Sequence, residues 1–174
     1  MASVDALPAA QAAEGLLVFE AVPKSDQGDL WSMLHVQSLD TGEPVFDQGD
    51  PAERIYVVRS GTIDIVFHPD DGGSILVASL QSGGVLGLSS ALGRANYTSG
   101  AVSTEPSVLV WMAREDLRRY CQAHPAGGNS VLEKLAIALA GRLGKAPTSV
   151  SAKVHRALSQ GCALPESNAD EAES

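Results

Sequence analysis

Short apolar runs separated by turn residues fill the chain from about residue 34 to residue 112, the pattern of an all-β domain. In residues 62–67, Ile63, Ile65 and Phe67 alternate with more polar positions, as expected for a strand with one buried and one solvated face. Strands are predicted at residues 34–39, 44–46, 55–58, 62–67, 75–80, 85–86, 100–103 and 108–112. About eight short strands predict an antiparallel sandwich, barrel or jelly roll. Parallel α/β is excluded because no helical patterns alternate with the strands.

Helical patterns lie on both sides of the strand region. Residues 15–33 predict short helical or irregular pieces packed on something larger, and residues 114–124 predict a helix that stops before Pro125. A longer helix is predicted to start at Ser130, because Ser130-Val-Leu-Glu133 matches a capping box. The fold class is therefore mainly β with flanking α: a roll followed by a helix and a long C-terminal helix.

The two ends of the chain differ from its middle. Residues 1–14 are small and polar without periodicity, which predicts a flexible N-terminus. Residues 15–145 form the predicted domain, and residues 146–174 predict a short helix followed by an acidic, disordered tail. A length of 174 residues fits one domain with tails.

Charge and hydropathy argue against two classes of binding partner, nucleic acids and membranes. The net charge of −9 repels phosphate backbones, which argues against direct nucleic-acid binding. No stretch approaches the roughly 18 apolar residues of a membrane span, and the N-terminus does not have the pattern of a secretory signal. We therefore expect a cytoplasmic protein with no membrane contact.

No catalytic or metal-binding constellation is found. Cys121 and Cys162 are too far apart in sequence for a metal motif or a disulfide framework, and the four histidines show no ligand spacing. A metal-dependent enzyme of the cupin type would need clustered His and Glu ligands, and no G-x-S-x-G nucleophile elbow occurs. The sequence predicts no enzyme, no metal and no resident cofactor.

A glycine-led turn offers a different chemistry. Gly87 precedes residues 88–92, a candidate single helical turn whose free backbone N–H groups would donate hydrogen bonds to an anion. Hydroxyl groups follow at Tyr97, Thr98 and Ser99. This part of the chain is the predicted site for a small anionic ligand.

The order of these turns carries a family resemblance. In residues 42–67, GEPVFDQGDPAERIYVVRSGTIDIVF, the marks are Gly42-Glu43, Phe46, Gln48-Gly49-Asp50, Tyr56-Val57-Val58 and Gly61. Residues 83–103 follow, GGVLGLSSALGRANYTSGAVS. Together these segments resemble the β-roll and phosphate-binding cassette of cyclic nucleotide-binding domains, the superfamily of catabolite activator protein and FNR-like regulators. The resemblance covers roughly residues 15–145. It implies a sensor domain standing alone, because residues 146–174 are too few for a winged helix-turn-helix.

Two positions depart from the pattern that the resemblance implies. The family places Glu after the cassette glycine, to hold the ribose 2′-hydroxyl, where this chain has Leu88. It places an Arg that neutralises the cyclic phosphate where this chain has Thr98, followed by Ser99. Arg94, four residues earlier, could replace that arginine only if the loop is rearranged. Cyclic AMP or cyclic GMP is thus a possible ligand that the sequence does not establish.

The predicted site and interface are drawn from two stretches. The predicted ligand-binding residues are Gly87, Leu88, Ser89, Ser90, Arg94, Tyr97, Thr98 and Ser99. The long helix has an apolar stripe, predicted to pair two copies in a homodimer, made of Leu132, Leu135, Leu139 and Leu143. In the alternative, a monomer, this stripe packs back on the roll or covers the pocket.

Two functions remain open at this stage. The first is a regulatory or sensor domain that binds a small, cyclic nucleotide-like ligand. The second is a degenerate domain that binds no nucleotide and serves as a protein-interaction or dimerisation module.

Overall fold

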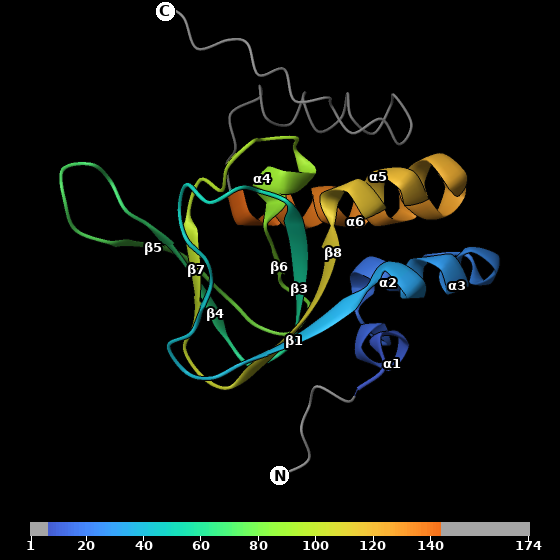
Figure 1. The fold of residues 1–174 in the computed structure, drawn as a ribbon, viewed down its shortest axis with the longest axis horizontal. Helices are drawn as coiled ribbons and strands as arrows, with labels where there is room; N and C mark the ends of the chain where they lie inside the picture. Colours follow the sequence, from blue (N-terminus) through green and yellow to red (C-terminus); the bar gives the residue numbers. More distant parts are fainter. Residues whose placement is uncertain (1–6, 144–174) are drawn as a thin grey trace, which may run out of the picture.

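In a computed structural model, in which residues 7–143 are described, the protein forms a β-roll with helices on one side (Figure 1). The strands are β1 (His35–Leu39), β2 (Pro44–Phe46), β3 (Arg54–Ser60), β4 (Ile63–Phe67), β5 (Ile75–Leu80), β6 (Val85–Leu86), β7 (Gly100–Ser103) and β8 (Ser107–Ala113). The helices are α1 (Ala9–Ala13), α2 (Leu17–Glu20), α3 (Lys24–Met33), α4 (Leu88–Ala91), α5 (Arg114–Ala123) and α6 (Pro125–Leu143). The prediction of a mainly β fold with flanking helices is confirmed.

Two four-stranded antiparallel sheets make the roll, with strand orders β1-β8-β3-β6 and β2-β7-β4-β5. The β3–β4 hairpin turns at Gly61, whose φ is +86°. A Cβ atom at Gly61 would lie 2.7 Å from the Pro106 carbonyl oxygen, so no other residue fits without movement. The glycine is therefore required by its backbone angle and by the neighbouring chain.

Strand β3 is buried on both of its faces. Tyr56 and Val58 point into the roll, where they meet residues of the second sheet such as Ile63. Ile55 and Val57 point the other way, into a core shared with the helices. This double burial explains why β3 is a continuous apolar run, whereas β4 alternates.

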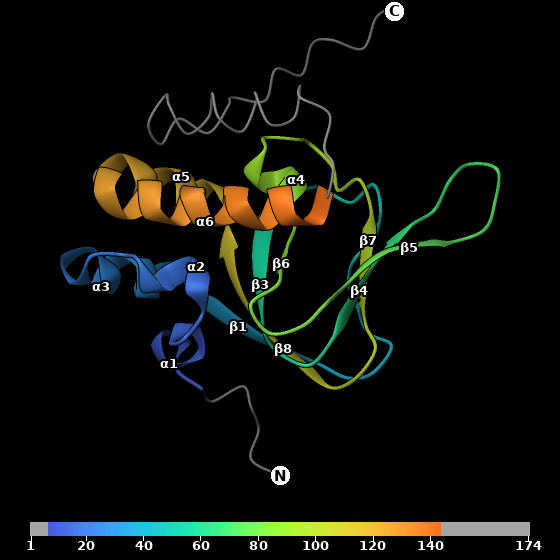
Figure 2. The same cartoon turned by 180° about the vertical axis from the view of Figure 1, so that it is seen from behind.

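The helices cover the outer face of the first sheet (Figure 2). Their contribution to the core includes Leu30 of α3, Leu117 of α5 and Leu135 of α6. These apolar side chains pack the helices onto the first sheet.

Two sequence-based predictions are wrong: the first residue of α6 and the conformation of residues 9–13. Helix α6 begins at Pro125, not at Ser130, and the Ser130 hydroxyl donates to the Ala126 carbonyl at 3.1 Å from within the helix. Proline suits the first helical position because its missing N–H would have no helical partner there. Residues 9–13, expected to be flexible, form α1, which buries Ala12 and Ala13. The short helix and acidic tail predicted for residues 146–174 lie outside the described residues, as does the start of the predicted flexible N-terminus.

Candidate functional site

The cassette begins at Gly87, which has a φ of +77° and caps α4. A Cβ atom here would lie 2.5 Å from the Arg54 carbonyl oxygen, so the turn packs directly on the backbone of β3. The Ser90 N–H donates to the Gly87 carbonyl at 2.9 Å. The N–H groups of Leu88 and Ser89 have no hydrogen-bond partner among residues 7–143.

The loop after α4 is held by the turn between β2 and β3. The Gly49 N–H donates to the Tyr97 carbonyl and the Tyr97 N–H donates to the Asp50 carbonyl, both at 2.9 Å. The Asn96 side-chain amide donates to the Gly49 carbonyl at 2.7 Å. The Gln-Gly-Asp turn noticed in the sequence therefore has a structural task, which is to fix the loop that borders the site.

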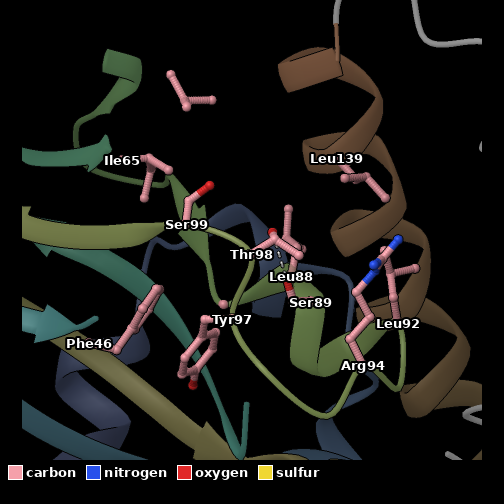
Figure 3. A pocket seen from close by; sticks show the side chains of 12 residues that line it. Phe46, Ile65, Leu88, Ser89, Leu92, Arg94, Tyr97, Thr98, Ser99 and Leu139 are labelled. Atoms are coloured by element: carbon pink, nitrogen blue, oxygen red, sulfur yellow. Dashed lines mark hydrogen bonds between the residues drawn. The ribbon is translucent and has the colours of Figure 1, made fainter. Parts of the chain in front are cut away.

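A cavity of about 280 Å³ opens beside the cassette (Figure 3). Its apolar lining residues are Phe46, Ile65, Val77, Leu88, Leu92, Tyr97 and Leu139. Its other lining residues are Gly87, Ser89, Arg94, Thr98 and Ser99. Arg94 is the only charged residue in this lining, and none is acidic. Ligand pockets commonly measure about 300–1,000 Å³, so this cavity suits a ligand at the small end of the range.

Tyr97 is a wall of the cavity and not a hydrogen-bonding group within it. Its ring is buried and stacks on Phe46 with the centroids 3.8 Å apart. Its hydroxyl donates to the Arg54 carbonyl at 2.8 Å and accepts from the Arg54 N–H at 3.1 Å. Burial raises the pKa of Tyr97 to about 12. In this structure the hydroxyl that was predicted to face a ligand is bonded to the backbone of Arg54.

The other predicted site residues fall into two groups. Gly87, Leu88, Ser89, Arg94, Tyr97, Thr98 and Ser99 all line the cavity. Ser90 does not: it is fully buried, and its hydroxyl has no partner among the described residues. Ser89 and Thr98 join the two ends of the cassette through their hydroxyl oxygens, 3.1 Å apart. Ser90 is thus an interior residue of α4 and not part of the lining.

Arg94 is exposed, and its side chain extends from the loop after α4 toward Leu139 of α6 (Figure 3). Its carbonyl accepts a hydrogen bond of 3.1 Å from the Arg114 guanidinium, which holds the backbone of the loop. The only cation in the described cavity wall is therefore at its rim.

Sequence reasoning did not identify two of the far walls of the cavity, Phe46 and Ile65, and it placed Leu139 there only in the alternative in which the stripe of the long helix covers the pocket. Phe46 and Ile65 come from the second sheet and Leu139 from α6, far from the cassette in the chain. Periodicity marked all three as apolar positions, but no local signal tells which cavity a buried side chain faces.

The apolar stripe of α6 packs on its own roll. Leu135 and Leu139 are buried, and Leu132 is partly buried against the same core. The side chain of Leu143 lies outside the described residues. This arrangement is the monomer alternative for these leucines, and the homodimer stays a prediction that would have to use the outer side of α6, where Ile137 is 58% exposed.

Within residues 7–143, no helix is long and apolar enough to cross a membrane. The same residues contain no group of three or more His, Cys, Asp or Glu side chains that could hold a metal ion.

Comparison with known proteins assigns the family. The profile of the cyclic nucleotide-binding domain matches residues 36–124, which is slightly more than half of the chain. The chain therefore belongs to the cyclic nucleotide-binding domain family, a family of regulatory domains.

Two curated relatives are regulators by name. The chain is 27% identical over 119 residues to the CRP-like cAMP-activated global transcriptional regulator of Mycobacterium tuberculosis, covering 68% of this chain and 53% of the relative. It is 29% identical over 104 residues to the global nitrogen regulator of Synechococcus elongatus, covering 59% and 47%. The chain thus spans about half the length of these relatives.

Solved structures share the fold. A cyclic nucleotide-binding domain from Methylobacillus flagellatus superimposes with a TM-score of 0.69 at 18% identity, covering 92% of this chain and 89% of that one. The catabolite activator protein of Thermus thermophilus superimposes with a TM-score of 0.64 at 26% identity, covering 78% and 62%. The predicted β-roll and its resemblance are thus confirmed.

Proposed function

We propose that this chain is a regulatory domain that binds a small anionic ligand in the cassette cavity. The observation that carries the proposal is the unfilled cavity of about 280 Å³ beside Gly87, with Arg94 at its rim. An acidic group would face Arg94 and the N–H groups of Leu88 and Ser89, while the remaining walls would contact apolar surface. The proposed role is that of a cytoplasmic sensor without catalytic activity and without direct contact to nucleic acid or membrane.

The lining favours weak binding of cyclic AMP and cyclic GMP. With Leu88 and Thr98 at the two departing positions, the cavity has no carboxylate for a ribose hydroxyl and no arginine at the usual phosphate position. Losing an arginine–phosphate pair costs on the order of 2 to 4 kcal/mol. That corresponds to a loss of roughly 30-fold to 1,000-fold in affinity.

Calorimetry with cyclic AMP, cyclic GMP and cyclic di-GMP tests the proposal. The natural chain should show dissociation constants no better than the high micromolar range. The double variant Leu88→Glu/Thr98→Arg should bind cyclic AMP at least about 30-fold more tightly, since it restores both charged contacts.

Arg94 is tested in the same titrations. Arg94→Gln should weaken binding of whichever nucleotide gives a signal by about tenfold, while Arg118→Gln on α5, away from the cavity, should not. Flat traces with all three ligands at millimolar concentration, for both the natural chain and the double variant, would rule out ligand binding of this kind.

A second candidate function is a protein-interaction or dimerisation module that binds no nucleotide. Two observations favour it: Leu88 is a buried apolar residue at the cassette, and the Tyr97 hydroxyl is already bonded to Arg54. Sedimentation equilibrium would test the homodimer. A monomer at concentrations up to about 100 μM, that is, with no sub-millimolar self-association, would argue against it.

A further inference from the structure

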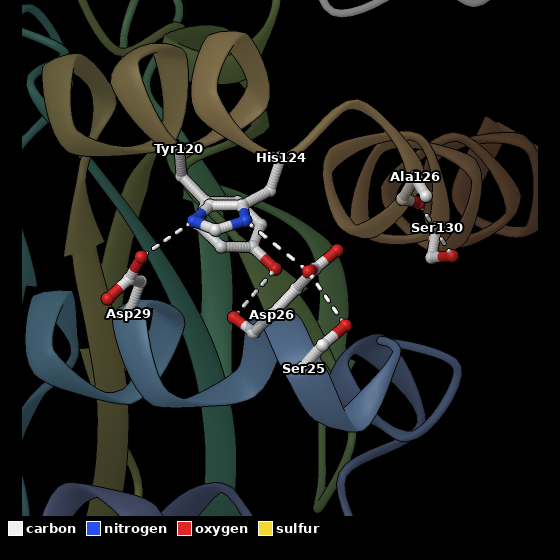
Figure 4. A network of polar contacts seen from close by, with 7 residues as sticks. All are labelled: Ser25, Asp26, Asp29, Tyr120, His124, Ala126 and Ser130. Carbon is white, nitrogen blue, oxygen red and sulfur yellow. Dashed lines mark hydrogen bonds and ion pairs between the residues drawn. The ribbon is translucent and has the colours of Figure 1, made fainter.

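One polar cluster lies away from the cavity, where α3 meets the junction of α5 and α6 (Figure 4). His124 is the residue between these two helices, and its ring lies between two carboxylates of α3. Its Nδ1 is 3.4 Å from Asp26 Oδ1, and its Nε2 is 2.7 Å from Asp29 Oδ2. Asp26 and Asp29 are three residues apart, so they share one face of the helix.

The cluster is tightly packed. The side chains of His124 and Asp26 are only 20% and 18% exposed, whereas that of Asp29 is 69% exposed. The Tyr120 hydroxyl donates to the Asp26 carbonyl at 3.2 Å, and its ring lies 5.0 Å from that of His124. A Cβ atom at Gly127 would lie 3.1 Å from Asp26 Oδ2, so the first turn of α6 also approaches α3 closely. Three helices therefore meet at this point.

The charged groups that contact the His124 ring are both carboxylates. The titratable groups that contact it in the described chain are Asp26 and Asp29 from α3 and Tyr120 from α5. Ser25 donates to the same Asp26 oxygen at 3.0 Å, and the first turn of α6 (Pro125-Ala-Gly-Gly) has no charged side chain.

The protonation state of the ring decides how many carboxylates it can bind. A neutral imidazole has one N–H and can donate to one carboxylate only, with the other nitrogen lone pair facing the second carboxylate. An imidazolium donates from both nitrogens and satisfies both carboxylates at once.

We propose that His124 is a proton-sensitive latch that fixes α3 against the α5–α6 junction. With both nitrogens protonated, the ring bridges Asp26 and Asp29; once it has lost one proton it can donate to only one of them, and α3 loosens. Because only the ring with both nitrogens protonated donates to both carboxylates, α3 is held more firmly at lower pH than at higher pH.

The His124 latch lies at the start of α6, the helix that reaches the cavity. α6 starts beside His124 and presents Leu139 to the cavity wall farther along. An effect of the latch on ligand binding rests on the proposed function, but the latch itself does not, and its test uses no ligand.

Hydrogen exchange of α3 amides, corrected for the intrinsic pH dependence of exchange, measures the latch. In the natural chain, the opening of α3 should increase roughly threefold to tenfold between about pH 5.5 and 8, the magnitude of a partly exposed charge-assisted bond. In His124→Gln the opening should be independent of pH and at least as large as in the natural chain at pH 8.

Asp29→Asn is the second variant, and it should fold even if His124→Gln does not, because Asp29 is mostly exposed. It should reduce the pH dependence of α3 opening by half or more. Asp70→Asn, an exposed residue at the β4–β5 hairpin, is the matched control and should respond like the natural chain. Opening of α3 that does not change with pH in the natural chain, or that changes equally in Asp29→Asn, would overturn the proposal.

Discussion

Removing the hydroxyl of Tyr97 should destabilise the fold without disturbing the packing of its ring. In Tyr97→Phe the ring keeps its burial and its stacking on Phe46, so the hydrophobic contribution is unchanged. What is lost is a pair of hydrogen bonds to the backbone of Arg54, at 2.8 and 3.1 Å. These bonds join the cassette loop to β3.

The expected loss is about 2 kcal/mol. Each bond contributes roughly 1 kcal/mol net, and the Arg54 N–H and C=O, which are part-buried, would lose a partner together. For a domain of this size, 1 kcal/mol corresponds to about 2–4 °C in melting temperature, so Tm should fall by roughly 4–8 °C.

Urea unfolding followed by circular dichroism measures this loss, read as a lower midpoint at an unchanged m value. Tyr56→Phe is the matched control. Its ring is also buried beside Phe46, and its hydroxyl interacts with the side chains of Arg54 and Tyr97, not with the backbone of Arg54. It should cost less than half as much. A loss below about 0.5 kcal/mol in Tyr97→Phe, or an equal loss in both variants, would show that the Arg54 backbone does not depend on the Tyr97 hydroxyl.

The same pair of proteins has a defined pH dependence. Burial raises the pKa of Tyr97 to about 12 from its ordinary value of 10.0, so the folded state holds this proton where the unfolded state has released it. The stability that Tyr97 contributes is therefore complete below about pH 10 and lost as the pH rises toward 12. The difference in unfolding free energy between the natural chain and Tyr97→Phe should shrink over that interval; a constant difference would contradict the assignment.

Two further substitutions probe the cassette. Gly87→Ala should destabilise the fold by more than about 2 kcal/mol in chemical denaturation, because it adds a clash with the Arg54 carbonyl to the cost of a positive φ. Gly42→Ala is the control, since Gly42 has a φ of +83° but nothing within 4 Å of the added Cβ atom. It should cost only about 1–2 kcal/mol. Ser90→Ala should leave stability unchanged or raise it by up to about 1 kcal/mol in the same assay, because it removes a buried hydroxyl that has no partner among the described residues. A clear loss of stability would instead reveal a hydrogen bond of Ser90 that this conformation lacks.

The strands of this fold could be predicted closely because turn residues mark their limits. Gly61 and Gly87 have the positive φ that their positions in the sequence suggested, and the strands between turns begin and end within about two residues of the expected positions. The single helical turn after Gly87 was also predicted, and α4 occupies Leu88–Ala91 with Gly87 as its cap.

The boundaries of the helices were harder to predict, for a physical reason. The capping box at Ser130 is a local pattern, whereas the true start at Pro125 depends on packing of the first turn against Tyr120 and Asp26. Helix α1 has no periodicity that a sequence would show; two buried alanines are enough to hold it on the core.

The stripe on α6 illustrates a limit of periodicity itself. Leucines at helical spacing predict that one face is buried, but the same spacing serves packing on the chain's own roll and packing on a second copy. In the structure Leu135 and Leu139 contact the chain's own core. The sequence alone does not distinguish these possibilities, because the free energy of burying a leucine is the same in either interface.

The two departures at Leu88 and Thr98 belong together. Leu88 is buried and shares its wall with Leu92 and Leu139, so a lone glutamate at this position would be a carboxylate placed among apolar side chains. The Ser89–Thr98 contact of 3.1 Å shows that the two ends of the cassette are close neighbours, so a cation at position 98 would lie near enough to offset that charge. An apolar residue at 88 and an uncharged one at 98 are therefore mutually consistent, because neither position places an unpaired charge in the cavity. For this reason the double substitution, and neither single one, is the informative test of what this cavity can bind.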